Sequence, residues 1–234
     1  MNTTTSPARA TAGAGRRLRS ALACGIAVSA CLAGSGCQLP GLIGAIGQNI
    51  EREKKVEVLA KYTGLDNQSV AVLIHADMGM LYEYPMVKPN LASNVSARLQ
   101  KDVPGCRLIS PTQVMAWEYQ TPAWAAMPMG HVCEALDVDR VVLVDVVEFR
   151  LNPPGNRWLW EGAAAANVTV FERDGVDPDA GADQFSVTAK FPKEDSVPRE
   201  SLRQEQVEAG LVGTFARNIA WLFHDHTEDK YPDR

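Results

Sequence analysis

The sequence is poor in the residues on which several kinds of protein depend. Only Cys106 and Cys133 lie beyond residue 37, and because two cysteines in apolar surroundings make no disulfide framework, we expect buried free thiols. Without residues 1–36 the chain has 19 basic and 28 acidic residues, a net charge of −9. Nucleic-acid binding depends on Lys and Arg at the phosphates, so this charge argues against a nucleic-acid partner.

Motifs of catalysis and metal binding are scarce as well. The sequence has no serine elbow, no Cys-His-Asn arrangement and no His-Glu-x-x-His motif. His224-Asp225-His226 has metal-ligand residue types, but the two histidines lie at the end of an expected helix, where residues two apart do not share a face. We therefore expect no catalytic residues, no metal and no cofactor.

The first 37 residues are the most informative part of what is present. Four arginines precede a small, apolar run at residues 21–33, which is too short for a comfortable membrane span and is typical of a secretory signal at residues 1–36. Cys37 follows Gly34-Ser35-Gly36 directly, and this arrangement resembles a bacterial lipoprotein signal, whose cysteine is acylated. Cys31, after Val28-Ser29-Ala30, fits the usual lipoprotein box better, but Cys37 leaves a longer apolar run and stands where the composition changes. We prefer Cys37 and keep Cys31 as the alternative.

The remaining chain shows the pattern of one α/β domain. We expect a glycine-rich stem at residues 37–66, in which residues 51–61 fit a short helix or an edge strand, then a domain at 67–227 and a tail at 228–234. The β-branched run at residues 69–76 predicts a buried strand. Further strands are expected at residues 107–109, 140–151, 158–172 and 185–191.

Helix signals separate these strands. Asn90 is a candidate N-cap for a helix that stops at Pro104-Gly105, and Ser110-Pro111 predicts an N-cap followed by proline at the first helical position. Thr121-Pro122 repeats that device, Pro128 opens a short helix through residue 136, and an apolar stripe predicts a long helix at residues 201–224. Together the elements predict an α/β (α+β) fold: a single mixed sheet of about five strands with a β-meander, packed by two main helices plus short helices.

Two stretches within this order resemble a known module. Residues 69–73 (Ser-Val-Ala-Val-Leu) and residues 133–149, from Cys133 to Phe149, are similar to the α/β module shared by the amino-terminal domain of the translocation protein TolB, the curli-export lipoproteins and the lipoprotein activators of penicillin-binding proteins. The resemblance covers about residues 69–225. Asp137 departs from it, since the family commonly has glycine there, and the segment at residues 117–128 is longer and richer in aromatics. The resemblance implies an envelope lipoprotein that binds other proteins and has no catalytic site.

Tryptophan and arginine mark the candidate binding residues, because both are enriched in binding hot spots. Trp158 and Trp160 are expected on the same strand face, beside Arg157 and after the turn at residues 152–156, although a place in the core is an equal alternative. The full set of candidates is Trp117, Trp124, Arg157, Trp158 and Trp160.

The sequence thus favours a noncatalytic lipoprotein that is anchored in the bacterial envelope and faces the periplasm. Its domain would bind an envelope protein or help to build an assembly, and a homo-oligomer is left open. The alternative is a small-ligand binder or hydrolase-like enzyme with a site near His75 and Asp77, which follow the first buried strand, at a sheet end where α/β proteins often bind ligands.

Overall fold

A mixed five-stranded sheet organises the computed structural model, which describes residues 55–193 and 196–229. The expected signal peptide, both candidate lipidation cysteines, most of the stem and all but the first two residues of the tail lie outside these residues. β2 is parallel to both of its neighbours, while β4, β6 and β7 form an antiparallel meander. The strand order is β3 (Arg107–Leu108), β2 (Ser69–Ala76), β4 (Arg140–Arg150), β6 (Gly162–Glu172) and β7 (Asp183–Phe191).

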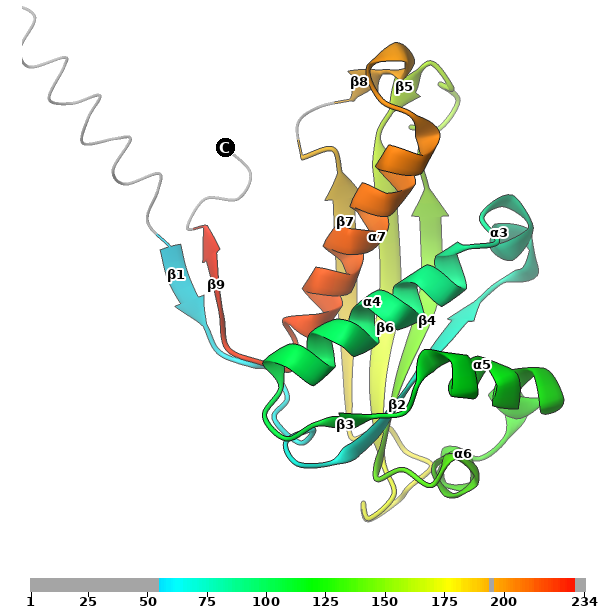
Figure 1. Ribbon diagram of the computed structural model, residues 1–234, viewed down its shortest axis with the longest axis vertical. Helices are drawn as coiled ribbons and strands as arrows, with labels where there is room; N and C mark the ends of the chain where they lie inside the picture. Colours follow the sequence, from blue (N-terminus) through cyan, green and yellow to red (C-terminus); the bar gives the residue numbers. More distant parts are fainter. Residues whose placement is uncertain (1–54, 194–195, 230–234) are drawn as a thin grey trace, which may run out of the picture. The chain divides into compact units, whose positions relative to one another are not determined.

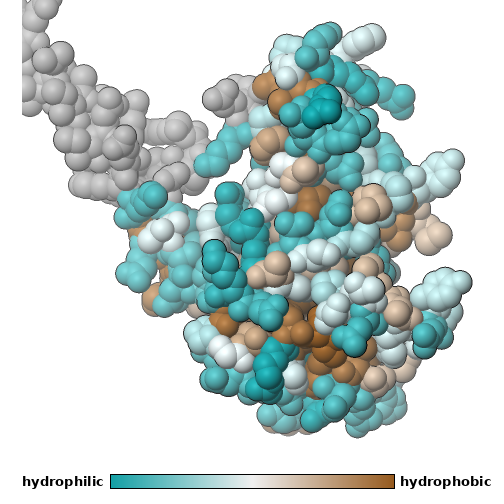
Figure 2. All heavy atoms as spheres, viewed as in Figure 1, coloured by the Kyte–Doolittle hydropathy of each residue, from teal (hydrophilic) through white to brown (hydrophobic). Residues whose placement is uncertain are grey.

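Two long helices cover one face of this sheet, as Figure 1 shows. They are α4 (Val87–Asp102) and α7 (Gln204–Ala220), and their apolar stripes pack with the inward residues of β2, β4 and β6 into the larger of two hydrophobic clusters. On the side seen in Figure 2 the outer surface is mostly hydrophilic, with small hydrophobic patches. The predicted fold class, a mixed sheet with a meander and two main helices, is confirmed.

The opposite face is covered in part by short elements. These are α5 (Pro111–Gln120), the 3-10 helix η1 (Trp124–Ala126) and α6 (Met129–Leu136), which pack on Ala71, Leu73 and Val141 in the second cluster. Cys133 belongs to this cluster and Cys106 to the other, so the sheet separates the two thiols, and both are buried and free. Burial raises the pKa of Cys106 to about 11.

The remaining elements are short and lie at the ends of the longer ones. They are α3 (Met78–Glu83), β5 (Leu159–Trp160) paired with β8 (Val197–Pro198), the 3-10 helix η2 (Arg199–Ser201), and β1 (Lys55–Val58) paired with β9 (His226–Asp229). The sequence pattern of residues 51–61 fits either a short helix or an edge strand. The structure describes residues 55–61 of this stretch, and they contain strand β1. Within residues 55–193 and 196–229, no helix has the length and apolarity that a membrane crossing requires.

Local residue chemistry explains most of the element boundaries. Ser110 is the N-cap of α5 with Pro111 at the first position, as predicted. Asp137 ends α6 with a φ of 51°, in the left-handed region where aspartate is among the better-tolerated non-glycine residues. Asp139 then ties β4 to β2: its Oδ2 accepts hydrogen bonds from the Ser69 hydroxyl at 2.6 Å and the Ser69 amide at 2.9 Å.

Three predicted helix starts are wrong. Asn90 lies inside α4, which begins at Val87, because Pro89 is compatible with a first helical turn and Val87 is fully buried. Thr121-Pro122 leads only to the short helix η1, and α7 begins at Gln204 because residues 199–201 form η2 first.

The first and last segments of the compact unit at residues 57–227 are hydrogen-bonded to each other. The backbone N–H groups of Lys61 and Tyr62 both donate to the carbonyl of Leu222, at 2.8 and 3.0 Å. The Tyr62 ring packs edge-on against Phe223, with the ring centroids 6.2 Å apart. The segment before β2 is thereby fixed to the end of the chain's last helical turn.

Candidate functional site

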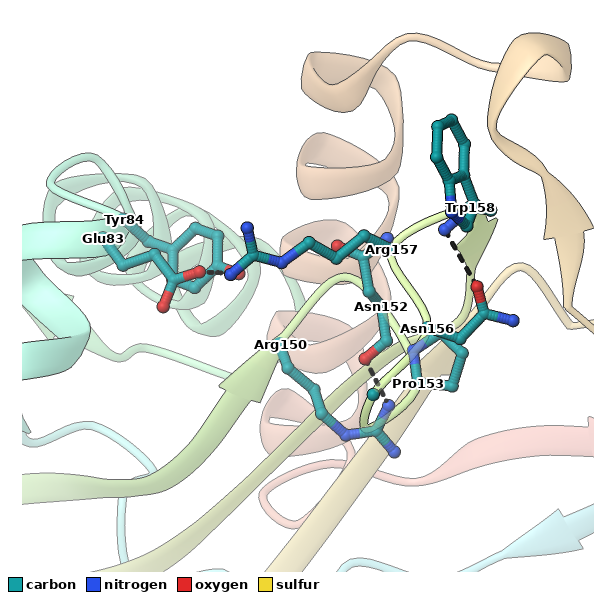
Figure 3. Close-up of a pocket in the computed structure, with 9 residues that line it drawn as sticks. Glu83, Tyr84, Arg150, Asn152, Pro153, Asn156, Arg157 and Trp158 are labelled. Carbon is teal, nitrogen blue, oxygen red and sulfur yellow. Dashed lines mark hydrogen bonds between the residues drawn. The ribbon is translucent and has the colours of Figure 1, made fainter.

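A hollow of about 510 Å³ lies beside the turn that links β4 to β5, and we call it the turn pocket (Figure 3). One wall is the end of α3 with the cap that follows it, and the other is the turn itself. The lining residues are Glu83, Tyr84, Arg150, Asn152, Pro153, Gly155, Asn156, Arg157 and Trp158.

The turn is held by a short series of hydrogen bonds. Gly155 has a φ of 77°, which favours glycine, and the Asn156 amide donates to the Pro153 carbonyl at 3.1 Å. The Asn156 side chain accepts from the Trp158 amide at 3.0 Å, and the Asn152 side chain donates to the Leu159 carbonyl at 2.6 Å. Residues 157 and 158 are therefore presented on a fixed backbone.

Two side chains of the pocket, Arg157 and Trp158, are available to a partner. Arg150 is occupied, since its guanidinium donates to Glu148 at 2.7 Å and to the Asn152 carbonyl at 2.9 Å. In the part of the chain that the structure describes, the Arg157 guanidinium has no such partner, and Trp158 is 76% exposed. Figure 3 shows Arg157 extending toward Glu83 and Tyr84, with the Trp158 ring pointing away from them.

The Tyr84 hydroxyl is one of the neutral polar groups of this pocket. It donates to the Glu83 carboxylate at 3.0 Å, and burial together with this carboxylate raises the pKa of Tyr84 to about 12. The hydroxyl therefore stays protonated at neutral pH. The charged residues of the lining are Arg150, Arg157 and Glu83, and Arg150 is already paired with Glu148, which lies outside the lining.

The structure separates the predicted binding residues into exposed and buried ones. The expectation that Trp158 and Trp160 share a strand face is wrong, because the predicted strand at 158–172 is broken: Trp158 lies in a turn before β5, and Glu161 separates β5 from β6. Trp160 is only 2% exposed, and its Nε1 donates to the carbonyls of Arg199 and Leu202 at 3.1 and 2.9 Å. Trp124 is 6% exposed and Trp117 is half-buried, both in the second cluster.

A second hollow, of about 270 Å³, lies on the sheet face that carries the short helices, and we call it the sheet pocket. Its polar side is formed by the sheet and its apolar side by Leu143 together with Trp124, Ala125 and Met129 from the segment of η1 and α6. The polar lining residues are His75, Asp145, Asn167, Thr169 and Gln184.

Register brings the polar residues of the sheet pocket into line. His75 is paired with Asp145, Asp145 with Asn167, and Asn167 with Ser186, so four neighbouring strands contribute one residue each to a row. His75 Nδ1 lies 2.7 Å from Asp145 Oδ1, and the Ser186 hydroxyl donates to Asn167 Oδ1 at 3.1 Å. Of the two residues named for the alternative site, His75 lines this pocket and Asp77 does not, because the Asp77 carboxylate caps α3 by accepting from the Met80 amide at 2.9 Å.

A buried ion pair lies behind the apolar wall of the sheet pocket. Lys88 Nζ is 2.8 Å from Glu118 Oε2 and 5.8 Å from the centroid of the Trp124 ring, and this ring packs edge-on against His75. Glu118 is 7% exposed, and its second oxygen has no hydrogen-bond partner. Burial raises the pKa of Glu118, whereas Lys88 opposes the rise.

Sequence reasoning missed most residues of the sheet pocket. Asp145 stands within the apolar run of residues 141–147, and Asn167 interrupts a run of alanine and valine, so both were visible as polar residues on buried strands. The alignment of Asp145 and Asn167 with His75 depends on strand register, which cannot be predicted from the local sequence. Lys88 and Glu118 lie on different helices and had no local signal. Among residues 55–193 and 196–229, no group of three or more His, Cys, Asp or Glu residues is placed to hold a metal ion.

Comparison with known proteins gives likenesses at the level of solved structures alone. No protein-family model matches the chain, and no curated protein matches it. The chain is similar to the PelC dodecamer from Paraburkholderia phytofirmans (11% identity, 73% of this chain and 97% of that one, TM-score 0.41). It is also similar to lipoprotein GNA1162 from Neisseria meningitidis (14%, 65% and 97%, TM-score 0.41) and to protein XCC0632 from Xanthomonas campestris (10%, 70% and 84%, TM-score 0.39). With TM-scores this low, these likenesses carry no argument about function.

Proposed function

We propose that this protein is a noncatalytic lipoprotein of the bacterial cell envelope whose α/β domain binds a protein partner through the turn pocket. The observation that carries the proposal is the pair Arg157 and Trp158, which line the 510 Å³ hollow: the guanidinium extends toward Glu83 and Tyr84, and the indole, 76% exposed, points away from them (Figure 3). Burial of an exposed indole by another molecule is favourable in free energy, and tryptophan is enriched among the residues that dominate protein interfaces.

The chemistry of the pocket supports an acidic segment as the occupant. Arg150 is satisfied by Glu148, so Arg157 is the cation left to receive a carboxylate, and a guanidinium binds a carboxylate through two parallel hydrogen bonds. The exposed indole of Trp158 would cover an apolar residue of the same partner. We therefore expect the partner to present both an acidic residue and an apolar one.

Site-specific crosslinking in cells tests the proposal. A photoreactive phenylalanine analogue at position 158 should give a discrete crosslinked product, and Arg157→Glu should abolish it by reversing the charge. The matched control is the same analogue at Tyr119, which is 88% exposed but lies on α5, outside the lining of the turn pocket. A product of twice the chain's mass would make the partner a second copy, in an envelope assembly. Identical products from positions 119 and 158, or a product that survives Arg157→Glu, would contradict the proposed surface.

The membrane attachment rests on the sequence of residues 1–37 alone. Acylation of Cys37, or of Cys31, would anchor the domain, because each buried methylene contributes about 0.8 kcal/mol and more than one acyl chain gives stable attachment. Metabolic labelling with a fatty acid should mark the wild type and fail in Cys37→Ala, while Cys31→Ala keeps the label. Labelling lost in Cys31→Ala instead would move the anchor, and labelling lost in neither variant would remove it.

A further inference from the structure

The sheet pocket has a layout that differs from that of the turn pocket and serves a different kind of ligand. One side is a set of polar side chains in fixed register on β2, β4, β6 and β7, and the other is an apolar wall of Trp124, Ala125 and Met129. Polar groups that converge opposite an apolar wall are typical of small-molecule sites, where they orient the ligand. A volume of about 270 Å³ limits the occupant to one small ring.

The hydrogen bonds within the row leave both donors and acceptors for a ligand. His75 Nδ1 bonds to Asp145 Oδ1, so His75 Nε2 and Asp145 Oδ2 remain. Asn167 Oδ1 accepts from Ser186, which leaves the Asn167 amide N–H groups as donors. The side chains of Thr169 and Gln184 have no hydrogen-bond partner among the described residues, and each can both donate and accept.

The charges around the pocket select against ions. No lysine or arginine lines it, so an anion would find no counter-charge there. The single carboxylate, Asp145, is already bonded to His75, and Lys88, which lies near the Trp124 wall, is paired with Glu118 at 2.8 Å. The ligand that matches is uncharged, with groups that donate and accept hydrogen bonds along one edge and with an apolar face.

We infer that the sheet pocket binds a single sugar ring. Each ring hydroxyl donates one hydrogen bond and accepts others, which matches the mixed set on His75, Asn167 and Gln184. The C–H face of the ring would lie against the wall of Trp124 and Met129. Lys88 Nζ lies 5.8 Å from the centroid of the Trp124 ring, and this ring packs edge-on against His75, so the wall and the row are in contact.

Titration of the full-length protein in detergent with glucose and with N-acetylglucosamine tests this assignment. Saturation-transfer NMR on the sugar should show binding, with magnetisation transferred to the ring protons. Asn167→Ala and Gln184→Ala should each weaken binding about tenfold, the usual effect of one lost hydrogen bond in a ligand site. Thr188→Ala is the matched control, since Thr188 lies on β7, two residues from Ser186 on the same strand face and outside the pocket lining, and should bind as the wild type does.

Several outcomes would overturn the inference. Binding of neither sugar would do so, and so would affinities that are unchanged in both Asn167→Ala and Gln184→Ala. Glycerol binding as tightly as the sugars would show that a ring is not what the pocket selects. Trp158→Ala should leave sugar binding intact, so that failure of the turn pocket and failure of the sheet pocket can be told apart.

Discussion

His75 and Asp145 lie opposite each other on neighbouring parallel strands, and their side chains are joined by a hydrogen bond of 2.7 Å between Nδ1 and Oδ1. Both side chains are about half exposed, so this bond is at the surface of the sheet and not in its core. It decides which ring nitrogen of His75 faces a ligand, because a carboxylate that accepts from Nδ1–H leaves Nε2 as an acceptor.

The first prediction concerns the tautomer of His75. Neutral His75 should carry its proton on Nδ1, held there by Asp145, and Asp145→Ala should release that preference. Nitrogen-15 NMR of the imidazole distinguishes the two forms through the shifts of Nδ1 and Nε2. Unchanged imidazole shifts in Asp145→Ala would show that the bond does not persist in solution.

The second prediction separates the two neighbouring tryptophans by stability. Trp160→Ala should lower the free energy of unfolding by about 4 kcal/mol, because a buried ring is lost and two carbonyls lose their donor. Trp158→Ala should change it by less than about 0.5 kcal/mol, since its ring is exposed. Urea unfolding followed by circular dichroism measures both, and equal effects would contradict the assignment of Trp160 to the core and Trp158 to the surface.

The third prediction concerns the Lys88–Glu118 pair. Glu118→Ala should destabilise the fold by about 3 kcal/mol, because it leaves a partly buried ammonium without its partner. The double variant Lys88→Met, Glu118→Leu should cost less than this single variant, since it removes both charges and fills the space. The exposed pair Lys101 and Asp102, 3.9 Å apart, is the control, and Lys101→Ala should change stability by less than about 0.5 kcal/mol. Thermal denaturation of these three variants and the wild type tests the order.

The fourth prediction is a pH dependence at the start of β4. Hydrogen bonds from the Ser69 hydroxyl and amide hold the pKa of Asp139 below its usual range. A lowered pKa in the folded state stabilises the fold above the ordinary aspartate pKa of about 4, and this contribution is lost as the pH falls through the lowered value.

Asp139→Ala should therefore cost roughly 2 kcal/mol at pH 7 and progressively less below pH 4 or so. Urea titrations at several pH values give the difference from the wild type. Asp137→Asn is the control, because Asp137 is almost fully exposed, its carboxylate has only a surface contact with Arg173, and asparagine tolerates its φ of 51°. A difference for Asp139→Ala that stays constant down to pH 2 or so would contradict this role.

How far the sequence predicted the structure depended on whether a signal was local. The strand at residues 69–76 was located to the residue, because its β-branched run is bounded by polar residues on both sides. The prediction of Asn90 as an N-cap was wrong because α4 already begins at Val87, which is buried in the core. The break at Glu161 had no such signal, and it is this break that places Trp158 and Trp160 in different environments.

The candidate sites were predictable only in part for the same reason. Arg157 and Trp158 could be singled out because a proline-rich turn next to an aromatic and an arginine is a local pattern. The row of His75, Asp145 and Asn167 comes from three strands that are far apart in the sequence. Its assembly is fixed by register, which the whole sheet determines.

The hydrogen bonds from Lys61 and Tyr62 to the carbonyl of Leu222 bring the beginning and the end of the domain together in space. The carbonyl that these two N–H groups share is therefore synthesised only when almost the whole domain has been made, so this contact forms late on a growing chain. It also means that the order of the segments can be changed without changing their neighbours. A circularly permuted chain, with residues 57 and 227 joined by a short linker and new termini opened at the turn of residues 153–156, keeps both hydrophobic clusters and every strand pairing of the main sheet.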